Sequence, residues 1–190
     1  MACPIAAGCC ALVRQHMEQN RNHIPSAALV KALMINGAQD VGLGVPNDDQ
    51  GWGKIDLTET IKPGGSDVQF IDDPAHAVAS LQEKEYRANV ADPSLPVVVT
   101  MVWRDFSGAS IQNKLHLRVF DGDELVANSS DSEFDIRNNV QKVVIENVAN
   151  PFVRIEVEGI NVSQGIPEGQ DVVQDFALAV GNVSDLELVN

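Results

Sequence analysis

The eight residues PVVVTMVW, from Pro96 to Trp103, carry the strongest secondary-structure signal in the chain. Five of the eight are β-branched, and β-branched side chains favour extended backbone. The stretch therefore predicts a strand, and it places the centre of the fold in the second half of the sequence.

Segments around this strand show the alternation of apolar and polar residues that is typical of strands. Leu115, Leu117 and Val119 alternate with Lys114, His116 and Arg118. Turn signals such as Asp121-Gly122-Asp123 and Asn150-Pro151 separate the segments. Seven or eight short strands divided in this way predict a mainly β fold, an antiparallel β-sandwich or barrel. Further strand segments are expected at or near Val68, Val78, 143–145, 152–157 and 176–180.

Two helices are expected before the strands. Residues 1–19 begin with MACPIAAGCCALV, which is apolar on every face and predicts a buried helix. Ser26 is a good N-cap for a second helix over 27–35, and Gly37 is expected to end it in the left-handed conformation. The Lys62–Ser66 stretch, KPGGS, predicts a linker.

The net charge of −14 is concentrated after this linker. Residues 1–62 carry a net charge of −1, and residues 63–190 carry −13. An acidic surface of this size repels phosphate backbones and anionic lipid, so nucleic acid and membrane surfaces are not expected as partners. The 13 apolar residues at the start are too few to span a bilayer, and no basic segment precedes them as in a secretory signal.

Three motifs in the first 62 residues resemble subtilisin-like serine proteases, the subtilase family. Met1-Ala2-Cys3-Pro4, followed by an apolar helix, is similar to the family's Gly-Thr-Ser-Met-Ala-x-Pro segment. ALVKALMINGA (28–38) and QGWGKIDL (50–57) resemble the next helix and the closing segment of the catalytic domain. Residues 63–190 resemble the jelly-roll β-domain that follows this catalytic domain in some members, through the segments VTMVWRD (99–105), NKLHLRV (113–119), RNNVQKVVI (137–145), IEVEGINVSQG (155–165) and QDFALAVGN (174–182).

The resemblance implies that residues 1–62 are the C-terminal part of an α/β catalytic domain and that 63–190 are a jelly roll. The family's nucleophilic Ser would stand immediately before Met1, and its Asp and His lie further upstream. The family is one of serine endopeptidases, but this chain by itself is expected to hydrolyse no peptide bonds, so its standing as an enzyme stays open. The expected partner is the upstream catalytic domain, which the β-domain would brace or whose substrate access it would modulate. The isolated chain is expected either to self-associate through residues 1–20 or to fold its helices back onto the β-domain, and family analogy implies secretion.

No residue is assigned to a catalytic, cofactor-binding or metal site. No sequence pattern places a Ser or Cys beside His16, His23, His76 or His116 together with a third orienting group. No cofactor is expected to be required.

Structural calcium is left open. The acidic turns 121–124 and 131–135 could supply carboxylate ligands. Family members often read Asn-Asp-Leu-Asp-Leu where this chain reads Asn113-Lys114-Leu115-His116-Leu117, so both acids of that pattern are replaced.

Two other classes of protein remain as alternatives: a non-catalytic binding module for carbohydrate or a protein surface, and a purely structural remnant. An exposed aromatic row or a concave acidic face would favour the binding module. Trp52 and Trp103 are expected in the core, and Cys3, Cys9 and Cys10 are expected to be reduced core residues. Sequons for N-glycosylation begin at Asn128, Asn161 and Asn182.

Overall fold

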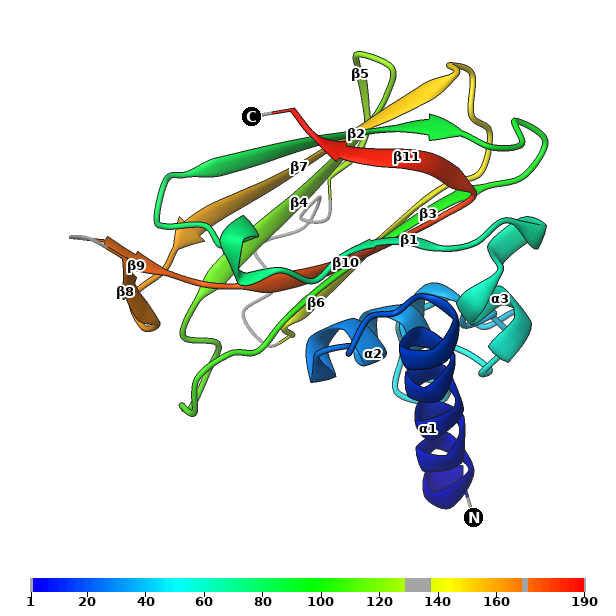
Figure 1. The fold of residues 1–190 in the computed structure, drawn as a ribbon, viewed down its shortest axis with the longest axis horizontal. Helices are drawn as coiled ribbons and strands as arrows, with labels where there is room; N and C mark the ends of the chain where they lie inside the picture. The colour runs from blue at the N-terminus through cyan, green and yellow to red at the C-terminus, as the bar shows by residue number, and fades with distance from the viewer. Residues whose placement is uncertain (1, 129–137, 169–170, 190) are drawn as a thin grey trace.

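The chain folds as two antiparallel β-sheets packed face to face, with helices against the outside of one sheet (Figure 1). The computed structural model describes residues 2–128, 138–168 and 171–189. The prediction of a mainly β sandwich preceded by helices is confirmed. One sheet contains, in spatial order, β1 (Gln69–Ile71), β10 (Phe176–Gly181), β3 (Val97–Trp103) and β6 (Val140–Ile145). The other contains β11 (Val183–Leu188), β2 (Glu83–Val90), β7 (Phe152–Asn161), β4 (Lys114–Asp121) and β5 (Glu124–Asn128), and β8 (Ile166–Glu168) pairs with β9 (Asp171–Val173).

The order of the strands is that of a jelly roll. The first sheet runs β1-β10-β3-β6, and the second runs β2-β7-β4-β5 with β11 added beside β2. Along the chain, β1 is followed by β2, β3 by β4 and β6 by β7, so the chain crosses repeatedly between the sheets. This interleaving of two Greek keys closes the sandwich and leaves few strand edges open.

The quoted stretch PVVVTMVW forms β3, which is covered on both faces. Val97, Val99, Met101 and Trp103 point into the core between the sheets, and Val102 belongs to the cluster under the helices. A strand covered on both faces has no side that must be polar, which explains why its sequence is a continuous apolar run. β4 and β7 alternate instead because their second face carries charged side chains.

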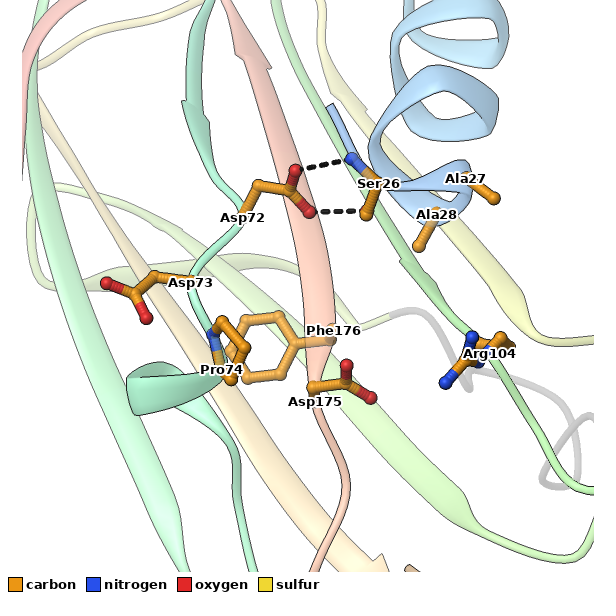
Figure 2. Close-up of a pocket in the computed structure, with 9 residues that line it drawn as sticks. All are labelled: Ser26, Ala27, Ala28, Asp72, Asp73, Pro74, Arg104, Asp175 and Phe176. Carbon is orange, nitrogen blue, oxygen red and sulfur yellow. Dashed lines mark hydrogen bonds between the residues drawn. The ribbon is translucent and has the colours of Figure 1, made fainter. Parts of the chain in front are cut away.

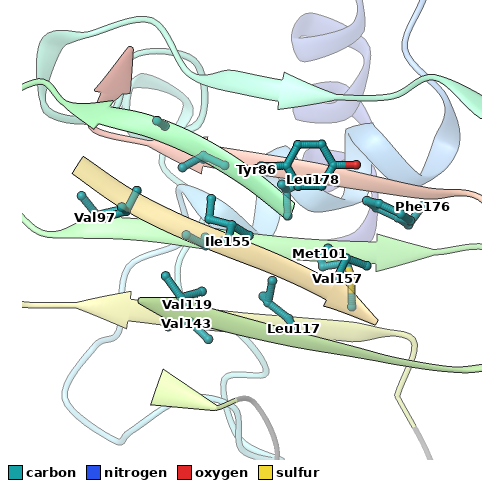
Figure 3. Close-up of a cluster of buried hydrophobic side chains, with 14 of the residues drawn as sticks. Tyr86, Val97, Met101, Leu117, Val119, Val143, Ile155, Val157, Phe176 and Leu178 are labelled. Atoms are coloured by element: carbon teal, nitrogen blue, oxygen red, sulfur yellow. The ribbon is translucent and has the colours of Figure 1, made fainter. Parts of the chain in front are cut away.

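The core between the sheets is built from one face of each sheet (Figure 3). Trp103 is 1% exposed and its indole N–H donates to the Asn113 carbonyl at 3.1 Å, so its predicted core position is confirmed. Tyr86 is fully buried, and its hydroxyl lies 2.9 Å from Nδ1 of His76. Burial raises the pKa of the Tyr86 phenol.

Three helices precede the sandwich: α1 (Ala2–Asn20), α2 (Ala27–Asn36) and α3 (Leu57–Ile61). The Ser26 hydroxyl accepts the Leu29 backbone N–H, so the predicted N-cap of α2 is confirmed. The expected left-handed Gly37 is wrong, because its φ is −83°. Glycine is required there by close packing, since a Cβ would lie 2.3 Å from the Thr60 backbone nitrogen.

Helix α2 lies across the outer face of the sheet β1-β10-β3-β6. Asn36, at its C-terminal end, is 4% exposed, and its amide N–H₂ donates to the carbonyls of Val98 and Ala179. Lys142, on β6, donates from Nζ to the carbonyls of Ile35 and Ala38. These side chains satisfy carbonyls on both sides of the interface and fix the helix to the sheet.

Helix α1 differs from the expected buried helix. It projects away from the sandwich with the N-terminus at its far end (Figure 1). Only Val13 and Met17 are buried, whereas Ile5 is 63% and Leu12 is 55% exposed. Its apolar first half has no covering element among the described residues.

The segment after α2 departs from the expected linker. Asp56 caps α3 by accepting the backbone N–H groups of Thr58 and Glu59. In the predicted linker, Pro63 is buried and begins the short 3₁₀ helix η1 (Pro63–Gly65). A second one, η2 (Pro74–His76), follows β1. The boundary at residue 62 stays a prediction.

Strands β2, β5, β8, β9 and β11 were not predicted from the sequence. The β2 sequence EKEYRANV is highly charged, and only Tyr86 and Ala88 are buried in it. Its Glu83 and Glu85 form ion pairs with Arg118 on β4 and Arg154 on β7, which no local pattern reveals.

Candidate functional site

An enclosed hollow lies where helix α2 stops covering its sheet (Figure 2). Phe176 pairs with Trp103, so Asp175 and Arg104 stand opposite each other just past the ends of β10 and β3. Alternation along the strands puts both on the same face as Ala177 and Val102, which lie under the helices. Their charged side chains therefore lie where the apolar face of the sheet ends, next to the first turn of α2.

Asp72 closes one side of this hollow and ties the sheet to the helix. Its carboxylate accepts the Ser26 backbone N–H at 2.8 Å and the Ser26 hydroxyl at 2.5 Å, as Figure 2 shows. It also lies 2.9 Å from Nε2 of His23, and its side chain is 6% exposed. Two segments separated by 46 residues are thus joined through one carboxylate.

This cluster corrects the expectation that no serine meets a histidine with a third group. His23, Ser26 and Asp72 do come together, but the carboxylate is central and the imidazole does not contact the hydroxyl in any described hydrogen bond. A serine nucleophile needs the histidine beside it as base, with the carboxylate behind. Ser26 also uses its oxygen as the helix cap. The geometry fits a structural latch.

A larger hollow continues from the first one along the same end of the sandwich. Its volume is about 610 Å³, against 130 Å³ for the hollow beside α2, and Pro74, Arg104 and Asp175 line both. Phe106, 43% exposed, stands on its other side in the loop between β3 and β4. Together the two hollows form a groove, called here the Arg104 groove.

A second surface is the apolar groove between α1, α2 and Trp52. It has a volume of about 550 Å³, and its wall includes Ala6, Cys10, Val30 and Met34. Trp52 is half-buried at this groove and packs against the helix cluster. Cys3 is exposed and Cys9 and Cys10 are half-buried, so the expected core position is wrong for Cys3, while all three are free thiols.

Glu83, Glu85 and Glu156 approach closely enough to hold a cation. However, Arg118 forms ion pairs with Glu83, Glu156 and Glu158. Arg154 does the same with Glu85 and Glu156, and its guanidinium also stacks on Phe120 at 3.7 Å. The carboxylates are therefore paired with arginine across three strands, and the cluster is an ion-pair network on the outer face of the second sheet.

In the candidate calcium turn at 121–124, one carboxylate already accepts hydrogen bonds from the protein backbone. Asp121 is 6% exposed and accepts the backbone N–H groups of Ala149 and Asn150. Asp123 and Glu124 point to solvent. The other candidate turn, 131–135, lies outside the described residues.

The three sequons differ in accessibility. Asn182 is 2% exposed, and its amide donates to the carbonyls of Asp92 and Leu95, so a glycan there is incompatible with this fold. Asn161 is exposed at the end of β7. The Asn128 sequon runs into residues outside the described ranges. Among the helices described, none has the length and apolarity to cross a bilayer.

Comparison with known proteins gives a distant relative and no family. No family model matches the chain. The chain is 25% identical over 193 aligned residues to the "Serine protease/ABC transporter B family protein tagA" of Dictyostelium discoideum. This alignment covers 85% of the chain and 11% of the relative, so the chain spans about a tenth of that protein's length. The chain is therefore similar to a protein named in part as a serine protease.

The residues of the Arg104 groove were not predicted from the sequence. Arg104 follows the apolar strand β3 and Asp175 precedes the apolar strand β10, and their place in the alternation puts them on the helix-bearing face. The two residues can be assigned to one site only when the register between β3 and β10 is known.

Proposed function

We propose that this chain is the C-terminal part of a subtilisin-like serine endopeptidase. Residues 1–62 would belong to its catalytic domain, and residues 63–190 would form a jelly roll that braces that domain or modulates substrate access. The similarity to a serine-protease-named protein and the three ordered motifs support this relation. Secretion is part of the same proposal.

The observation that carries the proposal is the uncovered apolar half of α1. A helix with Ile5 and Leu12 mostly exposed, beside an apolar groove at Trp52, needs a partner surface. An upstream catalytic domain would cover α1 and place the family's nucleophilic serine directly before Met1. The chain by itself then contributes packing and no catalytic group.

Two measurements test this proposal together. The purified 190-residue chain should release no dye from labelled casein. A longer chain, taken from an upstream coding sequence that ends in Gly-Thr-Ser in frame before Met1, should release dye and should lose this activity when that serine becomes alanine. Without the nucleophile and base, a subtilisin loses roughly 10⁶-fold in rate.

Two outcomes would contradict the proposal. One is a coding sequence with no such motif upstream. The other is casein hydrolysis by the 190-residue chain that a serine-directed inhibitor abolishes. In that second case, Ser26→Ala would show whether the His23–Asp72 cluster is responsible.

A non-catalytic binding module is the second candidate, and the Arg104 groove is the observation that favours it. A carbohydrate platform has less support, because Phe106 is the one exposed aromatic side chain among the described residues. A peptide or protein surface fits the groove better, as argued next.

A further inference from the structure

The Arg104 groove has the size and lining of a binding site for a short chain segment. Its larger hollow, about 610 Å³, falls within the range of roughly 300–1,000 Å³ that holds drug-sized ligands. Ala75, Ala77 and Val173 give it apolar walls, and Phe106 is exposed at its side. A ligand with an apolar or aromatic side chain would be desolvated here.

The charged groups lie where the two hollows join. Asp175 and Arg104 face the opening from neighbouring strands, and Asp73 stands nearby on the chain that leaves β1 (Figure 2). Arg104 takes part in none of the ion pairs among the described residues. Its guanidinium is thus available for a carbonyl of a bound chain.

The acidic groups at this junction are only partly used. Asp73 accepts the Ala75 backbone N–H through Oδ1, and Asp175 accepts the Gln174 amide through its own Oδ1. Each keeps a second carboxylate oxygen. Asp105, by contrast, has both oxygens occupied by the backbone N–H groups of Gln112 and Asn113. The junction therefore holds two carboxylates, each with one oxygen outside the described hydrogen bonds, and one guanidinium. Its net charge is negative.

We propose that the Arg104 groove binds an extended peptide segment that carries a basic side chain next to an apolar one. The apolar side chain would lie in the larger hollow against Phe106 and Ala77. The basic group would lie between Asp73 and Asp175, and Arg104 would donate to the peptide carbonyl between them. The chain's charge of −14 would favour approach of such a cation. This inference stands on the groove and does not depend on the protease proposal.

The test is a titration of the ¹⁵N-labelled 190-residue chain, followed by NMR. The probe is N-acetyl-Phe-Arg-amide, with N-acetyl-Phe-norleucine-amide and N-acetyl-Phe-Glu-amide as matched neutral and acidic peptides. The amide signals of Ala75, Ala77 and Asp175 should shift with the Arg peptide. The norleucine peptide should bind more weakly, and the Glu peptide more weakly still.

Variants separate charge recognition from a general apolar contact. Asp175→Asn should weaken binding of the Arg peptide by about fivefold, which is the effect of losing one partly exposed charge pair. Asp123→Asn, an exposed acid in the β4–β5 turn, should leave binding unchanged. Each variant's amide spectrum shows whether the fold is kept.

Three results would overturn the inference. The first is equal or tighter binding of the Glu peptide. The second is unchanged affinity in Asp175→Asn, and the third is a set of shifts confined to the α1–Trp52 groove.

Discussion

Lys142 shows at the residue scale how one buried cation fixes an element and makes stability depend on pH. Its ammonium donates to the carbonyl of Ile35, in the last turn of α2, and to that of Ala38, just past the helix. Burial lowers the pKa of Lys142 to about 8, from an ordinary value of 10.5. The charged form is therefore less favourable in the folded chain than in the unfolded one.

The pH dependence of this residue has a defined sign. Between about pH 8 and pH 10.5 the unfolded chain binds the Lys142 proton while the folded chain has released it. The free energy of unfolding should therefore rise with pH across this window through Lys142. In Lys142→Met that increment should be missing, as measured by urea unfolding at a series of pH values.

Lys54→Met is the matched control, because Lys54 is exposed. Its pH curve should run parallel to that of the unmodified chain. Parallel curves for Lys142→Met as well would show that Lys142 is solvated rather than buried.

At the scale of elements, the two long helices have opposite environments. Helix α2 is apolar on both sides, and Leu29, Ala32 and Leu33 are fully buried between the sheet and α1. Helix α1 covers it with Val13 and Met17 and then extends into solvent. The first half of α1 is the element from which we expect association.

The isolated chain should self-associate through this half of α1. Light scattering over a range of concentrations should give a mass above that of the monomer. The double variant Ile5→Lys with Leu12→Lys should be monomeric, because it places two charges in the contact.

Leu81→Lys is the control for this prediction. Leu81 is 84% exposed in a turn of the sandwich, so its replacement should leave association unchanged. A chain that stays monomeric at every concentration would contradict the prediction.

At the scale of the whole molecule, the acidic charge is organised by arginine and by backbone N–H groups. Arg118 and Arg154 form ion pairs with glutamates of the second sheet. Asp40 organises the 40–50 loop, where the Gln50 amide and the backbone N–H groups of Gly42, Leu43 and Gly44 lower its pKa. Several carboxylates are therefore engaged by arginine or by backbone N–H groups of the protein itself.

The melting temperature should accordingly respond to calcium no more than to magnesium. Both ions would screen the net charge of −14 to a similar extent, and addition of EDTA should not lower the melting temperature. Differential scanning calorimetry in the presence of each ion measures this. A rise with calcium alone, reversed by EDTA, would demonstrate a structural calcium site.

Features that depend on short-range sequence patterns could be predicted from the sequence. The run at 97–103, the alternation at 114–119 and the Ser26 cap each depend on neighbouring residues, and each prediction is confirmed. The glycine at 37 was correctly placed at the end of α2 but for the wrong reason. Its cause is the approach of Thr60, a contact between segments that only the fold brings together.

The sequence by itself determined that the chain would form a β-sandwich after helices, because strand and helix periods are local properties of side-chain order. The tertiary structure alone decided the strand order, the Asp72 latch, the pairing of the β2 glutamates with arginines, and the Arg104 groove. Each of these joins residues from distant segments through register and packing. Such contacts depend on which faces meet, and no local pattern contains that information.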